Sequence, residues 1–115
     1  MRDARELARD WIEIWDRGDP SALPLADDFV HVSPFGRLEG RARYLAVVEP
    51  MAKENVAALE IDDVFAEGDR ACITFSMETA NGPVACCDVV RVADGRIRSV
   101  HSYYDSRRLP HFEEY

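Results

Sequence analysis

The chain has 115 residues, 47% hydrophobic and 31% charged, which predicts one domain over residues 1–115 with a single core. Its formal net charge of −8 argues against nucleic acid or an anionic membrane surface as a partner, because both repel an acidic protein. No apolar run is long enough to span a bilayer, and the charged start MRDARELARD lacks the apolar core of a signal peptide. We therefore expect a cytoplasmic protein.

The first predicted element is an amphipathic helix over residues 3–17. Asp3 is a suitable N-cap, with Glu6 three residues later, and Gly18 ends the helix. The apolar face repeats at helical spacing and consists of Leu7, Trp11, Ile14 and Trp15.

A short helix, a strand and a second long helix are predicted next. Asp19-Pro20 has the pattern of an N-cap followed by proline at the first helical position, which predicts a short helix to about Leu25. A strand is expected over residues 29–33 and an amphipathic helix over residues 40–48. Pro50 should break or kink that helix, because proline cannot donate the helical hydrogen bond.

The second half of the chain reads as a meander of strands. Strands are predicted over residues 56–66 and 71–79 and twice within residues 82–105, with hairpin signals at Asn81-Gly82 and Asp94-Gly95. Residues 107–115 form a polar tail that either docks or frays. Helices followed by antiparallel strands indicate an α+β fold, in which a curved antiparallel sheet wraps around the N-terminal helices as a cone with an internal pocket.

Asp88 lies in the middle of an apolar strand, where an unpaired carboxylate would be costly to bury. A two-residue turn at Asn81-Gly82 would place Met77 opposite Cys86 and Phe75 opposite Asp88. Because Phe75 and Met77 belong to the apolar row of their strand, the pairing predicts that Asp88 and Cys86 face the core.

The register of the last hairpin has two solutions. A two-residue turn at Asp94-Gly95 would set His101 opposite Asp88, and outward-pointing arginines favour it. A three-residue turn over residues 93–95, with Gly95 in a bulge, would instead place Val100, Ser102 and Tyr104 on the pocket face.

The three cysteines do not form a disulfide framework or a zinc site. Cys86 and Cys87 are adjacent, so their side chains point to opposite faces of a strand, and the CxxC-type spacing of zinc sites is missing. We interpret the cysteines as small buried hydrophobic residues, with a catalytic thiol as the alternative. Neither a metal nor a cofactor is expected.

Three segments, WIEIWDRGD (11–19), LADDFVHVSPFGRLEGR (25–41) and DVVRVADGRIRSVHSYYD (88–105), resemble the nuclear transport factor 2-like superfamily in its SnoaL-like and ketosteroid-isomerase-like branch. The resemblance implies the cone fold, the three-residue turn in the last hairpin and a homodimer. It does not select an activity, because this fold hosts isomerases, cyclases, dehydratases, epoxide hydrolases and non-catalytic binders.

The family's catalytic positions are only partly kept. Ser33 stands where the resemblance places the aspartate base of ketosteroid isomerases, and Trp11 where it places their oxyanion tyrosine, while Asp88 matches their protonated aspartate. Ser102 stands where SnoaL-type cyclases and limonene-epoxide-hydrolase-type enzymes have an essential aspartate. The resemblance therefore argues against these reactions by the usual residues.

The catalytic candidates are Asp88 and His31. Burial would raise the pKa of Asp88, which suits a hydrogen-bond donor or an acid/base group, and the structural alternative is a carboxyl bonded to Trp11 or Tyr44. His31 alternates with Ser33 and so shares its face, where it could pair with Asp88 as a general base, or else be a satisfied core residue.

Two functions remain open at this point. One is a proton-transfer enzyme of isomerase, cyclase or dehydratase type acting on a small, mostly apolar organic molecule. The other is a non-catalytic ligand-binding or accessory protein that has lost the catalytic carboxylates. In both, the ligand-binding residues are expected to be Trp11, Trp15, Ser33, Phe35, Tyr44, Met51, Phe75, Met77, Cys86, Ser102 and Tyr104.

Overall fold

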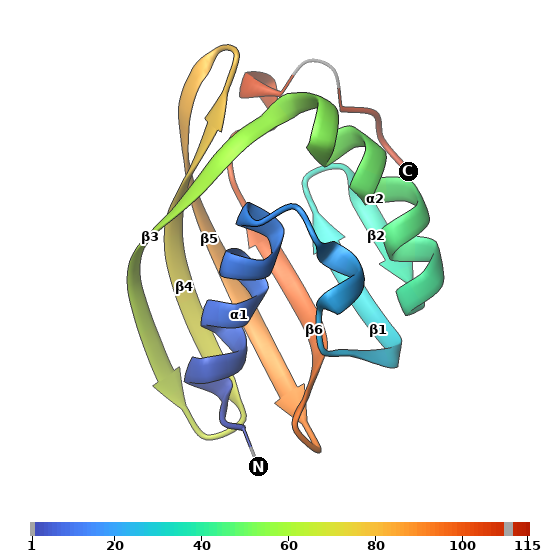
Figure 1. Ribbon diagram of the computed structural model, residues 1–115, viewed down its shortest axis with the longest axis vertical. Coiled ribbons are helices and arrows are strands. Elements are labelled where there is room, and N and C mark those ends of the chain that lie inside the picture. The colour runs from blue at the N-terminus through green and yellow to red at the C-terminus, as the bar shows by residue number, and fades with distance from the viewer. Residues whose placement is uncertain (1, 110–111) are drawn as a thin grey trace.

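The computed structural model describes residues 2–109 and 112–115, and its fold is the predicted α+β class (Figure 1). Six strands form one curved sheet in the order β2-β1-β6-β5-β4-β3, in which only the β1–β6 pair is parallel among the described strands. Helix α1 (Ala4–Asp16) packs across the concave face on β3, β4 and β5, and α2 (Arg41–Asn55) covers β1 and β2. The strands are β1 (Leu25–Ser33), β2 (Gly36–Glu39), β3 (Val56–Glu67), β4 (Arg70–Thr79), β5 (Gly82–Ala93) and β6 (Arg96–Tyr103).

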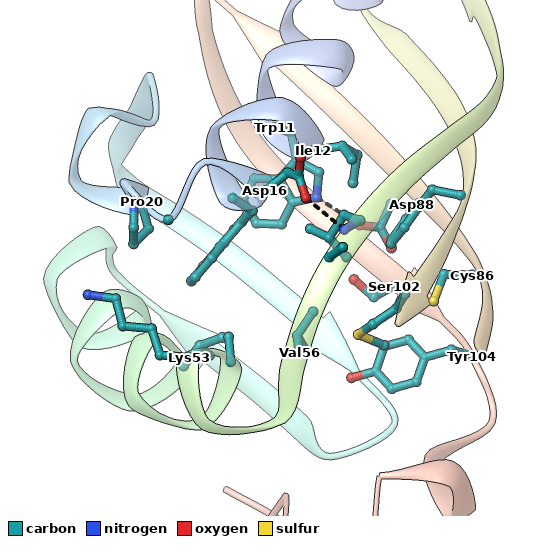
Figure 2. Close-up of a pocket in the computed structure, with 18 of the residues that line it drawn as sticks. Trp11, Ile12, Asp16, Pro20, Lys53, Val56, Cys86, Asp88, Ser102 and Tyr104 are labelled. Atoms are coloured by element: carbon teal, nitrogen blue, oxygen red, sulfur yellow. Dashed lines mark hydrogen bonds between the residues drawn. The ribbon is translucent and has the colours of Figure 1, made fainter. Parts of the chain in front are cut away.

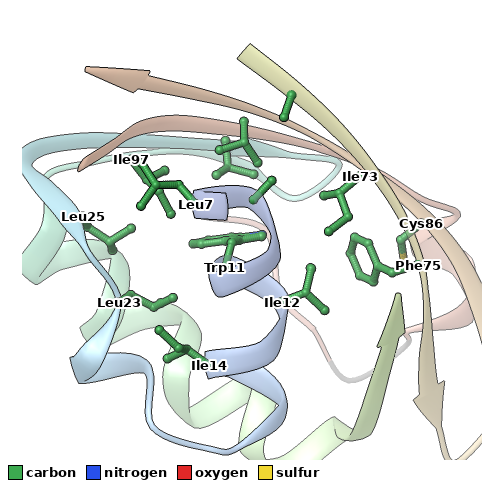
Figure 3. Packing of buried hydrophobic residues seen from close by; sticks show 14 of the residues in the cluster. Leu7, Trp11, Ile12, Ile14, Leu23, Leu25, Ile73, Phe75, Cys86 and Ile97 are labelled. Atoms are coloured by element: carbon green, nitrogen blue, oxygen red, sulfur yellow. The ribbon is translucent and has the colours of Figure 1, made fainter. Parts of the chain in front are cut away.

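Helix α1 agrees with the sequence pattern. The Asp3 carboxylate accepts a hydrogen bond from the Glu6 backbone N–H at 2.9 Å, as an N-cap does. The predicted face is buried at Leu7, Trp11 and Ile14, where it forms the core with the concave face of the sheet (Figure 3).

The segment after α1 differs from the prediction. The short helix is a single 3₁₀ turn, Pro20–Ala22, and β1 begins at Leu25 rather than at residue 29. Leu25 is fully buried and pairs with Ile97 of β6, so strand pairing distant in sequence prevails over the local helical signal. The chain then turns back as β2, an unpredicted edge strand that pairs antiparallel with β1.

Helix α2 does not break at Pro50 but continues to Asn55, which corrects one of the two effects expected of this proline. Proline removes only the hydrogen bond to the carbonyl of Ala46, and both residues are exposed, so water can satisfy that carbonyl. Tyr44 and Val48 anchor the first half in the core, and the Asn55 side chain donates to the carbonyl of Met51 at 2.8 Å near the end.

The β4–β5 hairpin turns at Ala80-Asn81, one residue earlier than predicted, because the Thr79 hydroxyl closes the turn. It accepts from the Asn81 N–H at 3.1 Å and donates to the Gly82 carbonyl at 2.8 Å. Asp88 therefore lies opposite Ile73 rather than Phe75. The register differs by two residues, which keeps every side chain on its predicted face, and both Asp88 and Cys86 are buried as expected.

The β5–β6 hairpin combines features of the two predicted registers. The turn is the two-residue Asp94-Gly95, with φ of 54° and 74°, so the predicted three-residue turn is wrong. A bulge on β6 between Ile97 and Ser99 then shifts the pairing by one residue. As a result Ser102 lies opposite Asp88, and the predicted inward orientation of Ser102 is confirmed.

The described part of the C-terminal tail docks on the fold. Leu109 is buried, the Phe112 ring stacks on Phe35 with ring centroids 5.3 Å apart, and the Tyr115 N–H donates to the Phe35 carbonyl at 2.9 Å. The prediction for this tail also covers Pro110 and His111, which lie outside the described residues.

The cysteines are only partly as predicted. Cys86 is buried, whereas Cys72 and Cys87 are half-buried on the convex face, with their Sγ atoms 3.1 Å apart. Burial, with the neighbouring Cys72 thiol, raises the pKa of Cys87 to about 11, and burial raises that of Cys86 to about 12. Such thiols are protonated near neutral pH, which disfavours the alternative of a catalytic thiolate.

Candidate functional site

A cavity of about 280 Å³ lies between α1, α2, the start of β3 and the concave face of the sheet (Figure 2). Most of its wall is apolar or aromatic, and its polar side chains are few. The apolar and aromatic lining includes Trp11, Ile12, Trp15, Tyr44, Val48, Leu59, Phe75, Met77, Cys86, Tyr104 and Phe112.

Asp88 supplies the only carboxylate in the buried part of this described lining. It is 2% exposed, and its Oδ2 accepts a hydrogen bond from the indole Nε1 of Trp11 at 2.7 Å. Its second oxygen, Oδ1, is buried and has no hydrogen-bond partner among the described residues. One carboxylate oxygen is thus held by the protein and the other is free to accept a bond.

His31 does not bond to Asp88 directly, in contrast to the predicted pair. Its Nε2 lies 2.9 Å from the hydroxyl of Ser102, which is the residue opposite Asp88 in the β5–β6 pairing. The four side chains form a polar cluster in the order Trp11, Asp88, Ser102, His31. The Nδ1 atom of His31 is buried and, within the described part of the chain, also has no partner.

Burial displaces the pKa values of the two titratable groups in opposite directions. The loss of hydration raises the pKa of Asp88 to about 6, although the hydrogen bond from Trp11 and the nearby Ser102 hydroxyl act to lower it. Burial, with a smaller repulsion from His101, lowers the pKa of His31 to about 3. Near pH 7, Asp88 is therefore mostly ionised and His31 is neutral.

Aromatic rings surround this polar cluster. The centroid of Tyr44 lies 5.8 Å from that of Trp11, 4.9 Å from that of His31 and 6.2 Å from that of Trp15. The last two contacts are edge-to-face, with interplanar angles of 65° and 84°. These rings fix the orientation of the Trp11 indole and thereby the bond that it donates to Asp88.

Most of the predicted site residues share this cavity, namely His31, Asp88, Trp11, Trp15, Tyr44, Phe75, Met77, Cys86, Ser102 and Tyr104. Ser33, Phe35 and Met51 do not belong to its described lining, and their predicted role in ligand binding stays a prediction. The Ser33 hydroxyl bonds to the hydroxyl of Tyr115 at 2.9 Å, and Phe35 packs between Tyr104 and Phe112. Met51 is half-buried elsewhere on α2.

Several lining residues were not predicted. Asp16 and Lys53 lie at the mouth, where Asp16 also accepts from the backbone N–H of Leu59 at 2.8 Å. Asp16 directly follows Trp15, which was predicted to bind the ligand, so its position on α1 could have indicated that it lies near the cavity. Phe112 reaches the cavity only because the C-terminal tail docks, and no local pattern indicates that.

The described residues contain no cluster of histidine, cysteine, aspartate or glutamate that could hold a metal ion. Likewise, none of the described helices is long and apolar enough to cross a membrane.

A curved sheet around two helices, with a cavity at their interface, defines the nuclear transport factor 2-like, ketosteroid-isomerase-like class of folds. The SnoaL-like domain family matches residues 8–100, so the chain belongs to that family. The predicted resemblance is thereby confirmed. None of the curated proteins matches the sequence.

Solved structures share the fold at low sequence identity. A protein of unknown function from Cytophaga hutchinsonii, described as NTF2-like, has a TM-score of 0.80 at 23% identity, covering 95% of this chain and 96% of its own. A candidate ketosteroid isomerase from Kribbella flavida has a TM-score of 0.78 at 21% identity, and the match covers 89% of this chain and 77% of the Kribbella chain. A protein with a ketosteroid-isomerase-like fold from Catenulispora acidiphila, in complex with trimethylamine, has a TM-score of 0.76 at 19% identity, with coverage of 90% and 88%.

Proposed function

We propose that this protein binds a small, mostly apolar organic molecule in the cavity, with the polar end of the molecule directed at Asp88. The observation that carries the proposal is a buried carboxylate with one unpartnered oxygen at the base of a mostly apolar chamber. Small-molecule sites commonly have this composition, in which apolar walls supply affinity and a few polar groups set orientation.

The cavity volume limits the size of the ligand. An apolar cavity of roughly 150 Å³ accommodates benzene, so a cavity of about 280 Å³ suits a molecule of about a dozen non-hydrogen atoms. The trimethylamine complex of the relative from Catenulispora acidiphila supports the idea that this fold accepts small organic molecules.

The hydrogen bonds of the polar cluster favour binding over enolisation chemistry. The indole N–H of Trp11 is donated to Asp88, and the bond between Ser102 and His31 engages a second polar hydrogen. A reaction that develops an oxyanion needs donors aimed at it, and the donors closest to Asp88 are already engaged. The loss of the family's carboxylates at Ser33 and Ser102 agrees with a binding role.

Proton transfer is the second candidate, because the pKa of about 6 for Asp88 suits a general base near neutral pH. Under that candidate, the protein would catalyse incorporation of solvent deuterium beside the carbonyl of small cyclic ketones or enones, as followed by NMR. Asp88→Asn would abolish the incorporation. Equal rates with the variant and with buffer alone would exclude this role.

Ligand binding is tested by titrating the protein with benzyl alcohol and following the indole N–H signals of Trp11 and Trp15 by NMR. We expect saturable shifts of both signals, because both residues line the cavity. Ala52→Trp at the mouth should weaken binding at least tenfold, whereas Ala46→Trp, at an exposed position on the same helix, should leave it unchanged. Unmoved indole signals, or equal affinities for the two variants, would contradict the proposal.

The homodimer and the cytoplasmic location remain predictions. Phe65 on β3 and Tyr103 on β6 are 62% and 51% exposed on the convex face, and we place the expected dimer contact on that face. Sedimentation velocity should show a dimer that Phe65→Glu converts to monomer, and a monomeric native protein at all concentrations would refute the expectation.

A further inference from the structure

We propose that the ligand presents a protonated amine, an alkylammonium group, to the free oxygen of Asp88. The proposal rests on the proposed function in one respect, namely that the cavity is the ligand site. It adds the chemical class of the polar end of the ligand.

The base of the cavity offers a hydrogen-bond acceptor. The ionised Asp88 carboxylate can only accept hydrogen bonds, and its Oδ1 has no partner among the described residues. The Ser102 hydroxyl lies 2.9 Å from Nε2 of the neutral His31, and these two atoms share one hydrogen bond. The unpartnered oxygen of Asp88 therefore calls for a ligand with N–H or O–H groups.

The charge of Asp88 distinguishes an ammonium from a neutral hydroxyl. Asp88 takes part in none of the salt bridges formed by the described residues. Lys53 is the cation at the mouth of the cavity, and its Nζ lies 3.5 Å from the Glu49 carboxylate. A buried carboxylate without a cationic partner is costly, so a positively charged ligand gains more at this position than a neutral one.

The surroundings of Asp88 also suit a cation. Trp11, Trp15, Tyr44 and Tyr104 line the same cavity, and aromatic faces attract ammonium groups. Asp16 adds a carboxylate at the mouth, and the net charge of −8 attracts cations towards the protein as a whole.

The test compares three ligands of similar shape at pH 8, where Asp88 is ionised: 2-phenylethylamine, 2-phenylethanol and phenylacetate. Dissociation constants are measured by NMR through the indole signals of Trp11 and Trp15. We expect the amine to bind at least tenfold more tightly than the alcohol, and phenylacetate to bind least. Asp88→Asn should reduce the ratio of amine to alcohol affinity to about one. Asp62→Asn, an equal charge change at an exposed position outside the cavity lining, should leave the ratio unchanged.

A pH series on the native protein provides a second readout that needs no variant. The preference for the amine should disappear as the pH falls through 6, because protonation of Asp88 removes its charge. The other titratable groups facing Asp88 are His31 on β1, Tyr44 on α2, Cys86 on β5 and Tyr104 on β6. Burial lowers the pKa of the histidine and raises that of the other three, so none of these four changes charge between pH 5 and 8. The charged groups at the mouth are Asp16 on α1 and Lys53 on α2.

The outcomes separate the two proposals. If the alcohol and the amine shift the tryptophan signals with equal affinity, the amine proposal is overturned and the cavity remains the binding site. If neither molecule perturbs Trp11 or Trp15, both proposals fail. A preference for the amine that persists in Asp88→Asn, or at pH 5, would also overturn the role of the Asp88 charge.

Discussion

Trp11→Ala is expected to lower the free energy of unfolding by about 5 kcal/mol. Trp11 is 3% exposed and packs against Phe29, Tyr44 and Trp15, so truncation leaves a large cavity between α1 and the sheet. It also removes the N–H that binds Asp88 Oδ2, which leaves both oxygens of a buried carboxylate without donors from α1. Denaturation with urea, followed by circular dichroism, measures the change.

Two variants separate packing from hydrogen bonding. Trp11→Phe keeps an aromatic ring but not the N–H. It should lower the free energy of unfolding by about 3 kcal/mol at pH 8 and by less at pH 4, where Asp88 is protonated. Trp15→Phe, at the half-buried neighbouring ring, should show no comparable pH dependence. A Trp11→Ala protein within about 1 kcal/mol of the native stability would contradict the central position of this residue.

The second large effect is the change in the free energy of unfolding as the pH falls from 7 to 4. The pKa of His31 is lowered from 6.5 to about 3 in the folded protein, so the unfolded state binds its proton more readily. The contribution of His31 to the free energy of unfolding is therefore fully present above pH 6.5 and is lost as the pH falls towards 3. At pH 4 the loss amounts to about 3 kcal/mol. Asp88 acts in the opposite sense. Its pKa is raised from 3.8 to about 6, so the folded state binds this proton more readily and gains about 2 kcal/mol between pH 7 and 4.

Urea denaturation at pH 7 and pH 4 tests this balance in three proteins. We consider the change in the free energy of unfolding from pH 7 to pH 4 that these two groups cause. The native protein should lose about 1 kcal/mol and Asp88→Asn about 3 kcal/mol, whereas His31→Gln should gain about 2 kcal/mol. The remaining carboxyl groups contribute alike to all three, so the differences between proteins are the informative quantity. Identical pH slopes in the three proteins would show that neither group titrates as described.

The fold could be predicted from the sequence wherever local patterns agree with tertiary packing. The apolar spacing of Leu7, Trp11 and Ile14 defined α1, and the apolar row of β4 placed Asp88 inside even though the predicted turn was displaced. That inference survived because a shift of two residues does not change the face of a strand. The bulge at Arg98, by contrast, has no sequence signal, and it decides that Ser102 rather than His101 faces the cavity.

Most of the predicted site residues line the cavity, but the hydrogen bond between two of them, His31 and Ser102, could not be predicted from the sequence. His31 and Ser102 are 71 residues apart in sequence, and their hydrogen bond depends on the parallel pairing of β1 with β6, which the expected antiparallel meander did not include. Ser33 and Phe35 were assigned to the pocket because the sequence left open whether the tail docks or frays, and it gave no sign that Phe112 and Tyr115 would contact these two residues.

The titration of the Asp88 side-chain carboxyl by carbon-13 NMR, with and without 2-phenylethylamine, tests the central claim most directly. We expect a midpoint near pH 6 in the free protein, moved to lower pH by the amine, because a bound cation stabilises the ionised carboxylate. A midpoint near the ordinary value of 3.8 that the amine leaves in place would contradict a buried, ligand-accepting carboxylate at the base of this cavity.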